Sequence, residues 1–228
     1  KQLFVERNSI VFDESLGLNF FDASSHKTAS ENKIPSNHRW IDQRTDGGYS
    51  VGNLICYAGE QNIGKSIWLA NDAVNYIKDG YDVAFISAEM AEGDVVQRIG
   101  ANMLNIPMSK YTTFSKDESK VKKKLASLSG SIIPPGNLYV KDYPPSQATV
   151  NDLEAYLRTL EESKGIKLKV VIVDYINILA NQRNPNTENT YMKIKQIAED
   201  LRAMASRNAW IIITATQINR SGYDASEI

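Results

Sequence analysis

Apolar and polar positions follow no sustained period in the first 48 residues of the chain and become regular after Gly52. From there on, short runs of consecutive apolar residues alternate with stretches in which apolar residues recur every three or four positions. A short apolar run predicts a strand that is buried on both faces of a sheet. The predicted strands are residues 54–58, 83–86, 138–140, 169–173 and 210–213.

The stretches between these runs predict helices with one buried face. Residues 66–78 carry apolar side chains at helical spacing and are followed by Gly80, a residue typical of helix C-termini. Further helices are predicted at 92–103, 150–160 and 191–204, and a charged surface helix at 115–129. Strands that alternate with helices are typical of βαβ units, so the predicted fold is α/β, with a mostly parallel sheet flanked by helices.

The first 48 residues predict a linker arm with short elements, including a helical turn near residues 18–21. Small polar residues dominate positions 22–30. The aromatic residues Phe20, Phe21 and Trp40 suit two arrangements, which are docking on another subunit and packing on their own domain.

The composition excludes several classes of protein. The chain has 228 residues, 42% hydrophobic and 23% charged, which is ordinary for a soluble globular protein and suits one large domain. A formal net charge of −1 gives no global attraction to nucleic acid, so any such contact must come from local loops or from an assembly. The lone Cys56 cannot form an internal disulfide, which fits a reducing compartment. No apolar stretch approaches the roughly 20 residues of a membrane span.

Residues 59–66 have the sequence GEQNIGKS, a G-x-x-x-x-G-K-S spacing between a predicted strand and a predicted helix. Glycine lets the backbone curl so that successive N–H groups point at a phosphate, and the following helix adds the positive end of its dipole. Lys65 would reach the β- and γ-phosphates, and the Ser66 hydroxyl would coordinate Mg²⁺. A glycine turn with a surface lysine is the alternative, but the flanking elements favour a nucleotide site. The predicted phosphate-binding residues are Gly59, Glu60, Gln61, Asn62, Ile63, Gly64, Lys65 and Ser66.

Further polar residues follow predicted strands, where the carboxyl ends of parallel strands face a ligand. Asp174 ends the run 169–173 and suits a Mg²⁺-orienting carboxylate, although it could also simply begin a turn. Many P-loop ATPases carry the catalytic carboxylate directly after this aspartate, but here Tyr175 follows. Glu89, after the second predicted strand, is therefore predicted to be the general base or water-positioning residue, with a helix N-cap as the alternative. Gln217 is predicted to sense the γ-phosphate through its amide.

The combination of these motifs resembles a RecA-type core, and more narrowly the ATPase domain of DnaB-type hexameric replicative DNA helicases, particularly those of tailed bacteriophages. The resemblance rests on the stretches GGYSVGNLICYAGEQNIGKS, ISAEMAEGDVVQRIGANML, VVIVDYINIL and IAEDLRAMASRNAWIIITATQINR. It implies a division into a linker arm, residues 1–38, and a RecA-like helicase ATPase domain, residues 39–228. The arm resembles the family's interdomain linker only loosely.

The resemblance implies an ATP-dependent motor that translocates on single-stranded DNA and unwinds duplex DNA, with ATP and Mg²⁺ as ligands. In such a motor, Lys65 would hold phosphate, Glu89 would activate water and Asp174 would support the metal ion. Gln217 would couple the state of the nucleotide to a DNA-facing loop. Arg98 matches a family arginine near the active site, although a solvent-facing helix residue is equally consistent with its position.

The resemblance also implies partners. The family forms homo-hexameric rings around single-stranded DNA and works with a primase and a helicase loader. A phage-encoded member would act in the cytoplasm of its bacterial host, without a membrane. Arg183, in the polar loop 181–186, and Asn219 and Arg220 near the end of the sequence are candidate DNA contacts. A ring that sums six small contributions does not require a basic monomer, which reconciles DNA binding with the net charge.

The family's arginine finger, which completes the ATP site of the neighbouring subunit, lies after the glutamine strand, and the sequence ends at Ile228. The chain is therefore expected to be a fragment that hydrolyses ATP weakly in isolation, because such a finger contributes roughly 10³–10⁵ in rate in NTPases. Two alternatives to the helicase stay open. They are a strand-exchange recombinase on the same core, and a nucleotide-gated regulator that binds no DNA. A small-molecule kinase is disfavoured because no arginine-rich lid is visible.

Overall fold

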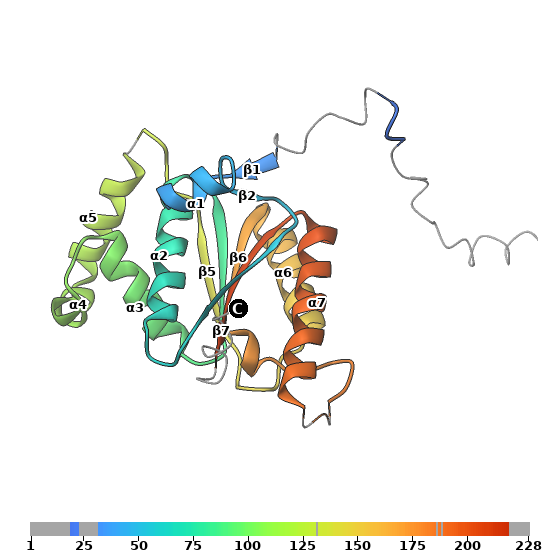
Figure 1. Cartoon of the computed structure of the whole chain (residues 1–228). Helices are drawn as coiled ribbons and strands as arrows, with labels where there is room; N and C mark the ends of the chain where they lie inside the picture. Colours follow the sequence, from blue (N-terminus) through green and yellow to red (C-terminus); the bar gives the residue numbers. More distant parts are fainter. Residues whose placement is uncertain (1–18, 23–31, 131, 186, 188, 219–228) are drawn as a thin grey trace, which may run out of the picture. The chain divides into compact units, whose positions relative to one another are not determined.

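The computed structural model describes residues 19–22, 32–130, 132–185, 187 and 189–218. The chain divides into two compact units, Lys1–Glu31 and Asn32–Ile228. In the first unit, residues 19–22 form a hydrogen-bonded turn near the predicted helical turn, and the rings of Phe20 and Phe21 pack edge to face. The second unit contains every helix and strand of the described residues (Figure 1).

Five parallel strands form the central sheet and confirm the predicted α/β class (Figure 1). They are β3 (Leu54–Gly59), β4 (Asp82–Ser87), β5 (Leu138–Asp142), β6 (Leu168–Asp174) and β7 (Ile211–Gln217). Their order across the sheet is β3-β7-β6-β4-β5, so several neighbouring strands are far apart in sequence. Residues 170–173 of β6 and 211–213 of β7 are β-branched and fully buried, because helices cover both faces of the sheet.

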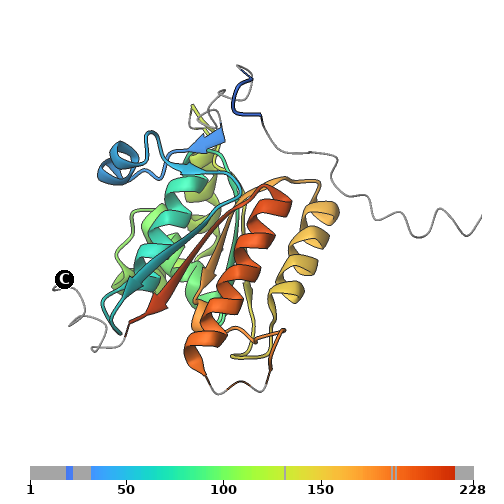
Figure 2. The same cartoon turned by 45° about the vertical axis from the view of Figure 1, so that its right-hand side comes forward.

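Two layers of helices cover the sheet (Figures 1 and 2). One layer consists of α2 (Lys65–Lys78) and α3 (Glu92–Met103), and the other of α6 (Val150–Lys164) and α7 (Thr190–Asn208). Successive residues of a strand point to opposite faces. In β6, Val171 therefore packs toward α6 and α7, whereas Ile172 packs toward α2 and α3. The hydrophobic core thus has two halves, one on each side of the sheet.

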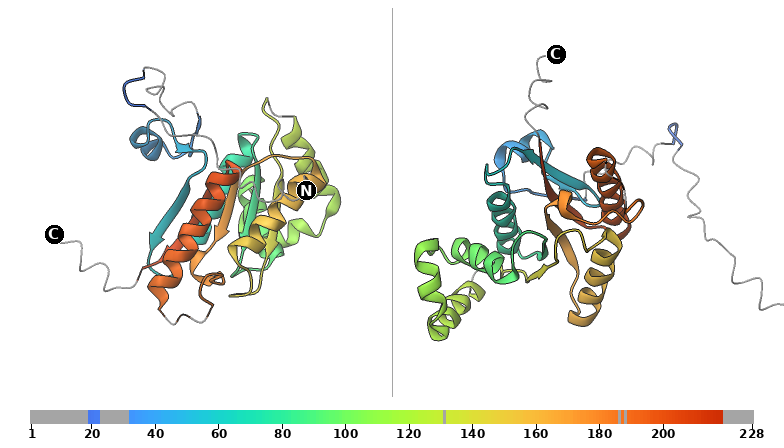
Figure 3. Two further views of the ribbon diagram at one scale, coloured as in Figure 1. Left: turned by 90° about the vertical axis from the view of Figure 1, so that its right-hand side faces the viewer. Right: turned by 90° about the horizontal axis from the view of Figure 1, so that it is seen from below.

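The predicted surface helix 115–129 is in fact part of a pair of helices. α4 (Met108–Ser115) and α5 (Glu118–Ser129) lie beyond α3, outside the layer that covers the sheet (Figure 3). The break falls at Asp117, whose side chain accepts a hydrogen bond from Lys120 N over 3.1 Å and caps α5. The sequence pattern missed α4 because a two-turn helix that buries one side chain shows no clear period. The predicted surface position of α5 is confirmed, since none of its residues is buried.

Residues 32–50 form short elements, which the sequence predicted in general terms but did not locate. These are β1 (Lys33–Ile34), paired antiparallel with β2 (Tyr49–Ser50), and α1 (Arg39–Arg44). A partly buried network anchors them to α2. His38 Nε2 lies 2.7 Å from Asp72 Oδ1, and the His38 ring stacks on Trp68. The Tyr57 hydroxyl donates to the same carboxylate over 2.8 Å. Residues 32–38 belong to the second compact unit. The sequence predicted the end of the linker arm at residue 38, and that boundary stays a prediction.

The aromatic side chains that were candidates for docking are exposed. Phe20 and Phe21 are exposed in the first unit, and Trp40 on α1 is 56% exposed with the Arg44 guanidinium 6.0 Å from its ring. Docking of these residues on another subunit stays a prediction. In the described part of the chain, no helix combines the length and the hydropathy that crossing a membrane requires.

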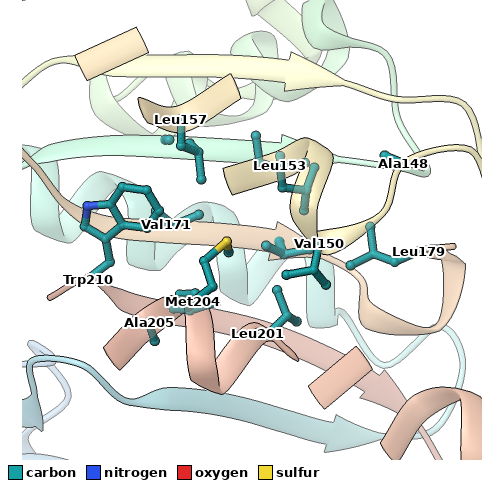
Figure 4. Packing of buried hydrophobic residues seen from close by; sticks show 14 of the residues in the cluster. Ala148, Val150, Leu153, Leu157, Val171, Leu179, Leu201, Met204, Ala205 and Trp210 are labelled. Atoms are coloured by element: carbon teal, nitrogen blue, oxygen red, sulfur yellow. The ribbon is translucent and has the colours of Figure 1, made fainter. Parts of the chain in front are cut away.

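Leu153 on α6 is fully buried in the half of the core shown in Figure 4, together with Val171 and Met204. We expect Leu153→Ala to lower the free energy of unfolding by about 2–5 kcal/mol, because it removes buried methyl groups and leaves a cavity. The control Leu125→Ala, at a half-exposed position on α5, should change it by less than about 0.5 kcal/mol. Urea denaturation measures both values, and equal losses would contradict the assigned core.

Glu154 joins α6 to the C-terminal end of α7. Its carboxylate accepts hydrogen bonds from Arg207 Nη2 over 2.6 Å and from Asn208 Nδ2 over 2.8 Å. Burial raises the pKa of this carboxyl, but the hydrogen bonds from Arg207 and Asn208 outweigh burial and lower the pKa from 4.5 to about 2. Because the folded pKa lies below the unfolded value, the interaction stabilises the fold above about pH 4.5 and is lost as the pH falls toward 2.

We expect Glu154→Gln to lower the free energy of unfolding by about 1–3 kcal/mol at neutral pH, with a deficit that shrinks below about pH 4.5. Denaturant titrations across this range measure the effect. Glu162→Gln, at an exposed position on the same helix, is the control and should leave the pH dependence of stability unchanged. A deficit that is constant with pH would show that the Glu154 charge is not responsible.

Candidate nucleotide-binding site

The phosphate loop joins the end of β3 to the start of α2. Asn62 (φ 65°) and Gly64 (φ 93°) adopt left-handed backbone conformations, and Gly64 directly precedes the first residue of α2. The free N–H groups at this helix end therefore face the loop. A Cβ atom on Gly59 would lie 2.2 Å from Ile63 Cδ1, so the Ile63 side chain packs directly against the first residue of the loop. The strand, the turn and the helix that the motif requires are all present.

Lys65, the first residue of α2, holds its ammonium group over the phosphate loop. Nζ donates to Gly59 O over 3.0 Å and to Glu60 O over 2.6 Å. Both acceptors are neutral carbonyl oxygens, whereas phosphate oxygens are charged and form stronger hydrogen bonds with an ammonium group. The side chain is therefore positioned to exchange these carbonyl contacts for a bound phosphate.

Asp174, the last residue of β6, faces the first turn of α2. Its Oδ1 accepts a hydrogen bond from Ser66 Oγ over 3.2 Å, and the residue is 1% exposed. Burial raises the pKa of this carboxyl, and the hydrogen bond from Ser66 opposes the rise. The buried Oδ2 has no hydrogen-bond partner among the described residues, which is unfavourable unless a cation or a donor meets it. A hydroxyl and a carboxylate side by side are the hard oxygen ligands that Mg²⁺ prefers, so these residues fit the predicted metal ion.

A cavity of about 370 Å³ lies at this edge of the sheet. Its walls come from the phosphate loop with the start of α2, from α3, and from the residues at or after the ends of β4, β6 and β7. The carboxyl ends of parallel strands meet at one edge, which explains why segments so distant in sequence converge. The predicted residues that line the cavity are Gln61, Asn62, Gly64, Lys65, Ser66, Glu89, Arg98, Asp174 and Gln217. Three predicted loop residues do not line it, namely Gly59, Glu60 and Ile63.

Glu89 follows β4 and is exposed at the cavity. The turn around it is fixed by two hydrogen bonds, from Met90 N to Ser87 Oγ and from Ala88 N to Asp174 O, each 2.9 Å long. The backbone of Glu89 is therefore held at the same sheet edge as Asp174, and its exposed carboxylate keeps access to water. A solvated carboxylate beside a phosphate site can accept a proton from water.

Arg98 reaches the cavity from α3, where its positive charge offsets part of the rise that burial causes in the pKa of the Asp174 carboxyl. The sequence was consistent with an Arg98 near the active site and with one that faces only solvent. The structure places Arg98 at the cavity. Gln217, the last residue of β7, presents a neutral amide to the same cavity. The catalytic roles of both residues stay predictions.

The sequence predicted no role for three residues that line the cavity, Ile67, Met90 and Tyr175. Of these three, Tyr175 is the one with a side-chain hydroxyl. Its hydroxyl accepts a hydrogen bond from Gln217 Nε2 over 3.2 Å. Burial raises the pKa of this phenol, and the negative charges of Glu89 and Asp174 raise it further, so it stays protonated at neutral pH. In the sequence, the feature that could have pointed to Tyr175 is its position directly after Asp174 at the end of a predicted strand.

Arg183, a candidate DNA contact, does not line the cavity. It follows β6 and pairs with two carboxylates on α7. Its Nε donates to Asp200 Oδ1 over 2.9 Å and its Nη1 to Glu199 Oε2 over 2.8 Å. The guanidinium thus anchors the start of the polar loop to α7, and contact with DNA stays a prediction. The other two candidates, Asn219 and Arg220, lie outside the described residues.

A parallel sheet whose strand ends surround a G-x-x-x-x-G-K-S loop defines a P-loop nucleotide-binding domain. The sequence profile of the DnaB-like helicase C terminal domain matches residues 33–226. The chain therefore belongs to the DnaB-like helicase C-terminal domain family.

Individual relatives agree with this family. The DnaB-like replicative helicase of Enterobacteria phage T4 is 31% identical over 96% of this chain and 47% of its own length. The replicative DNA helicase DnaB of Leifsonia xyli subsp. xyli is 26% identical over 90% of the chain and 43% of its own length. The chain thus spans about half the length of these curated relatives.

Solved structures show the same RecA-like fold. A DnaB-like replicative helicase, described together with its interactions with primase, superposes with a TM-score of 0.68 at 21% identity, over 86% of this chain and 46% of that one. A second solved structure, of an ATPase domain, superposes with a TM-score of 0.69, also at 21% identity, over 86% of this chain and 67% of that one. The predicted fold is therefore confirmed.

We expect Asp174→Asn to weaken the binding of a nonhydrolysable ATP analogue by about tenfold or more in the presence of Mg²⁺, because a neutral amide is a poorer Mg²⁺ ligand. Without Mg²⁺, the affinity should stay within about twofold of the unsubstituted chain. Titration calorimetry with and without the metal ion measures the difference. Asp142→Asn, at the end of β5 but outside the cavity, is the control, and a loss that does not depend on Mg²⁺ would contradict the metal-ligand role.

Proposed function

We propose that the chain is the ATP-hydrolysing motor domain of a replicative DNA helicase, which couples hydrolysis to translocation on single-stranded DNA and to duplex unwinding. The observation that carries this proposal is the convergence of the phosphate loop, two carboxylates and a strand-end glutamine on one cavity, in a chain of the DnaB-like helicase family. A simple nucleotide binder would need the loop alone. An exposed carboxylate and an amide at the same cavity are what hydrolysis and its detection require.

The phosphate loop and Lys65 would bind the β- and γ-phosphates through backbone N–H groups and the ammonium group. Ser66 and Asp174 would hold Mg²⁺. When bound, this ion neutralises charge on the phosphate oxygens. The burial of Asp174 supports this role because a desolvated carboxylate gains more from a cation than an exposed one does.

Glu89 would accept a proton from the water that attacks the terminal phosphate. Its exposure and its fixed turn suit this task, because a general base must reach its water from a defined position. Gln217 would detect the terminal phosphate without changing its own charge. Its strand, β7, lies between the phosphate-loop strand β3 and the strand of Asp174, so a displacement there reaches both.

For the whole assembly, we propose a homo-hexamer on single-stranded DNA, with a primase and a helicase loader as partners. Membership in the DnaB-like family supports the motor, and one of the structural relatives, a DnaB-like replicative helicase, interacts with primase. A relative from Enterobacteria phage T4 supports action in the cytoplasm of a bacterial host. The near-neutral charge of the chain is compatible with DNA binding, because a ring adds the contributions of several subunits.

We expect the full-length gene product that carries this chain to unwind a forked DNA substrate with ATP and Mg²⁺. Lys65→Ala should abolish unwinding by weakening nucleotide binding, whereas Glu89→Gln should keep binding within about threefold and lower hydrolysis by a factor of about 10² or more. Fluorescent-nucleotide binding, phosphate release and strand separation measure the three steps. Lys167→Ala and Glu162→Gln, at exposed positions outside the cavity, are the matched controls.

Three results would contradict the proposal in different ways. Hydrolysis that survives Glu89→Gln would remove that residue from the mechanism. DNA-bound filaments without unwinding would identify a strand-exchange protein. Failure to bind an oligothymidine strand in the presence of a nonhydrolysable ATP analogue, at any salt concentration, would identify a regulator that binds no DNA.

A further inference from the structure

The strand that ends in Gln217 is held unequally by its two neighbours. On one side, β7 pairs with β3 as far as its last residue, where Gln217 lies opposite Gly59 of the phosphate loop. On the other side, the backbone pairing of β7 with β6 ends at Val173 and Thr214. Beyond that pair, β6 ends at Asp174 and is followed by a short 3-10 helix, Ile176–Ile178. Gln217 is thus fixed to the phosphate loop by backbone, but it contacts the segment after Asp174 through side chains.

Two side-chain hydrogen bonds bridge this gap. Thr216 Oγ1 donates to Asn177 Oδ1 over 3.0 Å, and Gln217 Nε2 donates to the Tyr175 hydroxyl over 3.2 Å. Neighbouring residues of a strand point to opposite faces, so the two bonds lie on different sides of β7. Tyr175 and Gln217 both line the nucleotide cavity, whereas Thr216 and Asn177 do not. Only the Tyr175–Gln217 bond is in a position to act on a bound nucleotide.

The two partners of this bond differ in rigidity. A partly buried glutamine has three side-chain torsions, and an unheld amide samples several orientations at an entropic cost to any contact it later makes. The Tyr175 ring has two torsions and packs against the half of the core formed with α2 and α3. Its hydroxyl is therefore a fixed point for the mobile end of Gln217.

We propose that Tyr175 is a positioning residue, which acts through its hydrogen bond to Gln217 to present the Gln217 amide toward the terminal phosphate of a bound nucleoside triphosphate. The inference rests on the proposed nucleotide-binding function of the cavity and extends it to the discrimination between triphosphate and diphosphate. It does not depend on DNA unwinding. A diphosphate lacks the group that the amide would contact, so loss of the bond affects the triphosphate alone.

Tyr175→Phe tests this idea because it keeps the packed ring and removes one oxygen atom. The measurement is the affinity of the chain for a nonhydrolysable ATP analogue and for ADP, both with Mg²⁺, expressed as their ratio. We expect Tyr175→Phe to lower the preference for the triphosphate by about three- to tenfold, the range of one net hydrogen bond, and to leave ADP affinity within about twofold. Gln217→Met should produce a similar loss.

The double variant Tyr175→Phe with Gln217→Met distinguishes positioning from a separate contact. If the hydroxyl acts through the amide, the double variant loses no more preference than Gln217→Met alone. Losses that multiply would show that Tyr175 acts independently and would overturn the proposal.

Two further variants control for general effects. Thr216→Val removes the hydrogen bond to Asn177, and Tyr143→Phe removes a tyrosine hydroxyl outside the cavity. Each variant should keep the preference for the triphosphate within about twofold of the unsubstituted chain. A Thr216→Val loss equal to that of Tyr175→Phe would indicate general loosening and would overturn the proposal.

The outcomes also separate this inference from the proposed helicase function. A full-length product that does not unwind DNA, but whose triphosphate preference depends on Tyr175 as described, contradicts the helicase and supports the positioning role. A product that unwinds DNA, with a preference that Tyr175→Phe leaves unchanged, contradicts the positioning role alone. A chain that binds triphosphate and diphosphate equally well also overturns the inference.

Discussion

The parallel pairing of β3, β7 and β6 is the constraint on which the site depends. Parallel strands end at a common edge, and the register brings Gly59 opposite Gln217 and Val173 opposite Thr214. The phosphate loop, the glutamine amide and Asp174 therefore keep fixed spacings that no flexible loop has to create. A slip of one residue in β6 would turn Asp174 to the other face of the sheet, away from the Ser66 hydroxyl, and would exchange the apolar side chains that pack on the two layers of helices.

Around this edge, burial distinguishes groups of the same chemical type. Asp174 is buried against the start of α2 and has one oxygen with no partner in the described part of the chain, which suits a cation. Glu89 has the same functional group but is exposed, which suits contact with water. Burial raises the pKa of the Asp174 carboxyl, and the positive charges of Lys65 and Arg98 at the same cavity offset part of that rise. The site thus combines opposite charges at short range, and a polyanionic ligand adds negative charge that the lysine, the arginine and a metal ion can balance.

The nucleotide site is also connected to segments outside it through the helices that flank the sheet. α2 begins at the phosphate loop and carries Asp72, which holds His38 in front of α1. The segment after Asp174 leads into the polar loop that Arg183 attaches to α7. Both connections are hydrogen-bonded pairs between a charged or titratable group and a carboxylate that is at most 9% exposed.

The sequence by itself determined the five strands of the central sheet, the helices that cover it, the phosphate loop and the candidate residues that follow three of the strands. Burial on both faces leaves uninterrupted apolar runs, and phosphate binding demands glycine at fixed spacing. It also indicated that Asp174, Glu89 and Gln217 share a ligand, since parallel strands end at one edge. Only the tertiary structure decided what depends on contacts between distant residues. Those contacts include the anchoring of residues 32–50 through His38 and Asp72, the pairing of Arg183 with α7, and the hydrogen bond that makes Tyr175 part of the site. None of these contacts leaves a local pattern in the sequence, because the two residues of each contact are too far apart for periodicity or motif spacing to reveal the pairing.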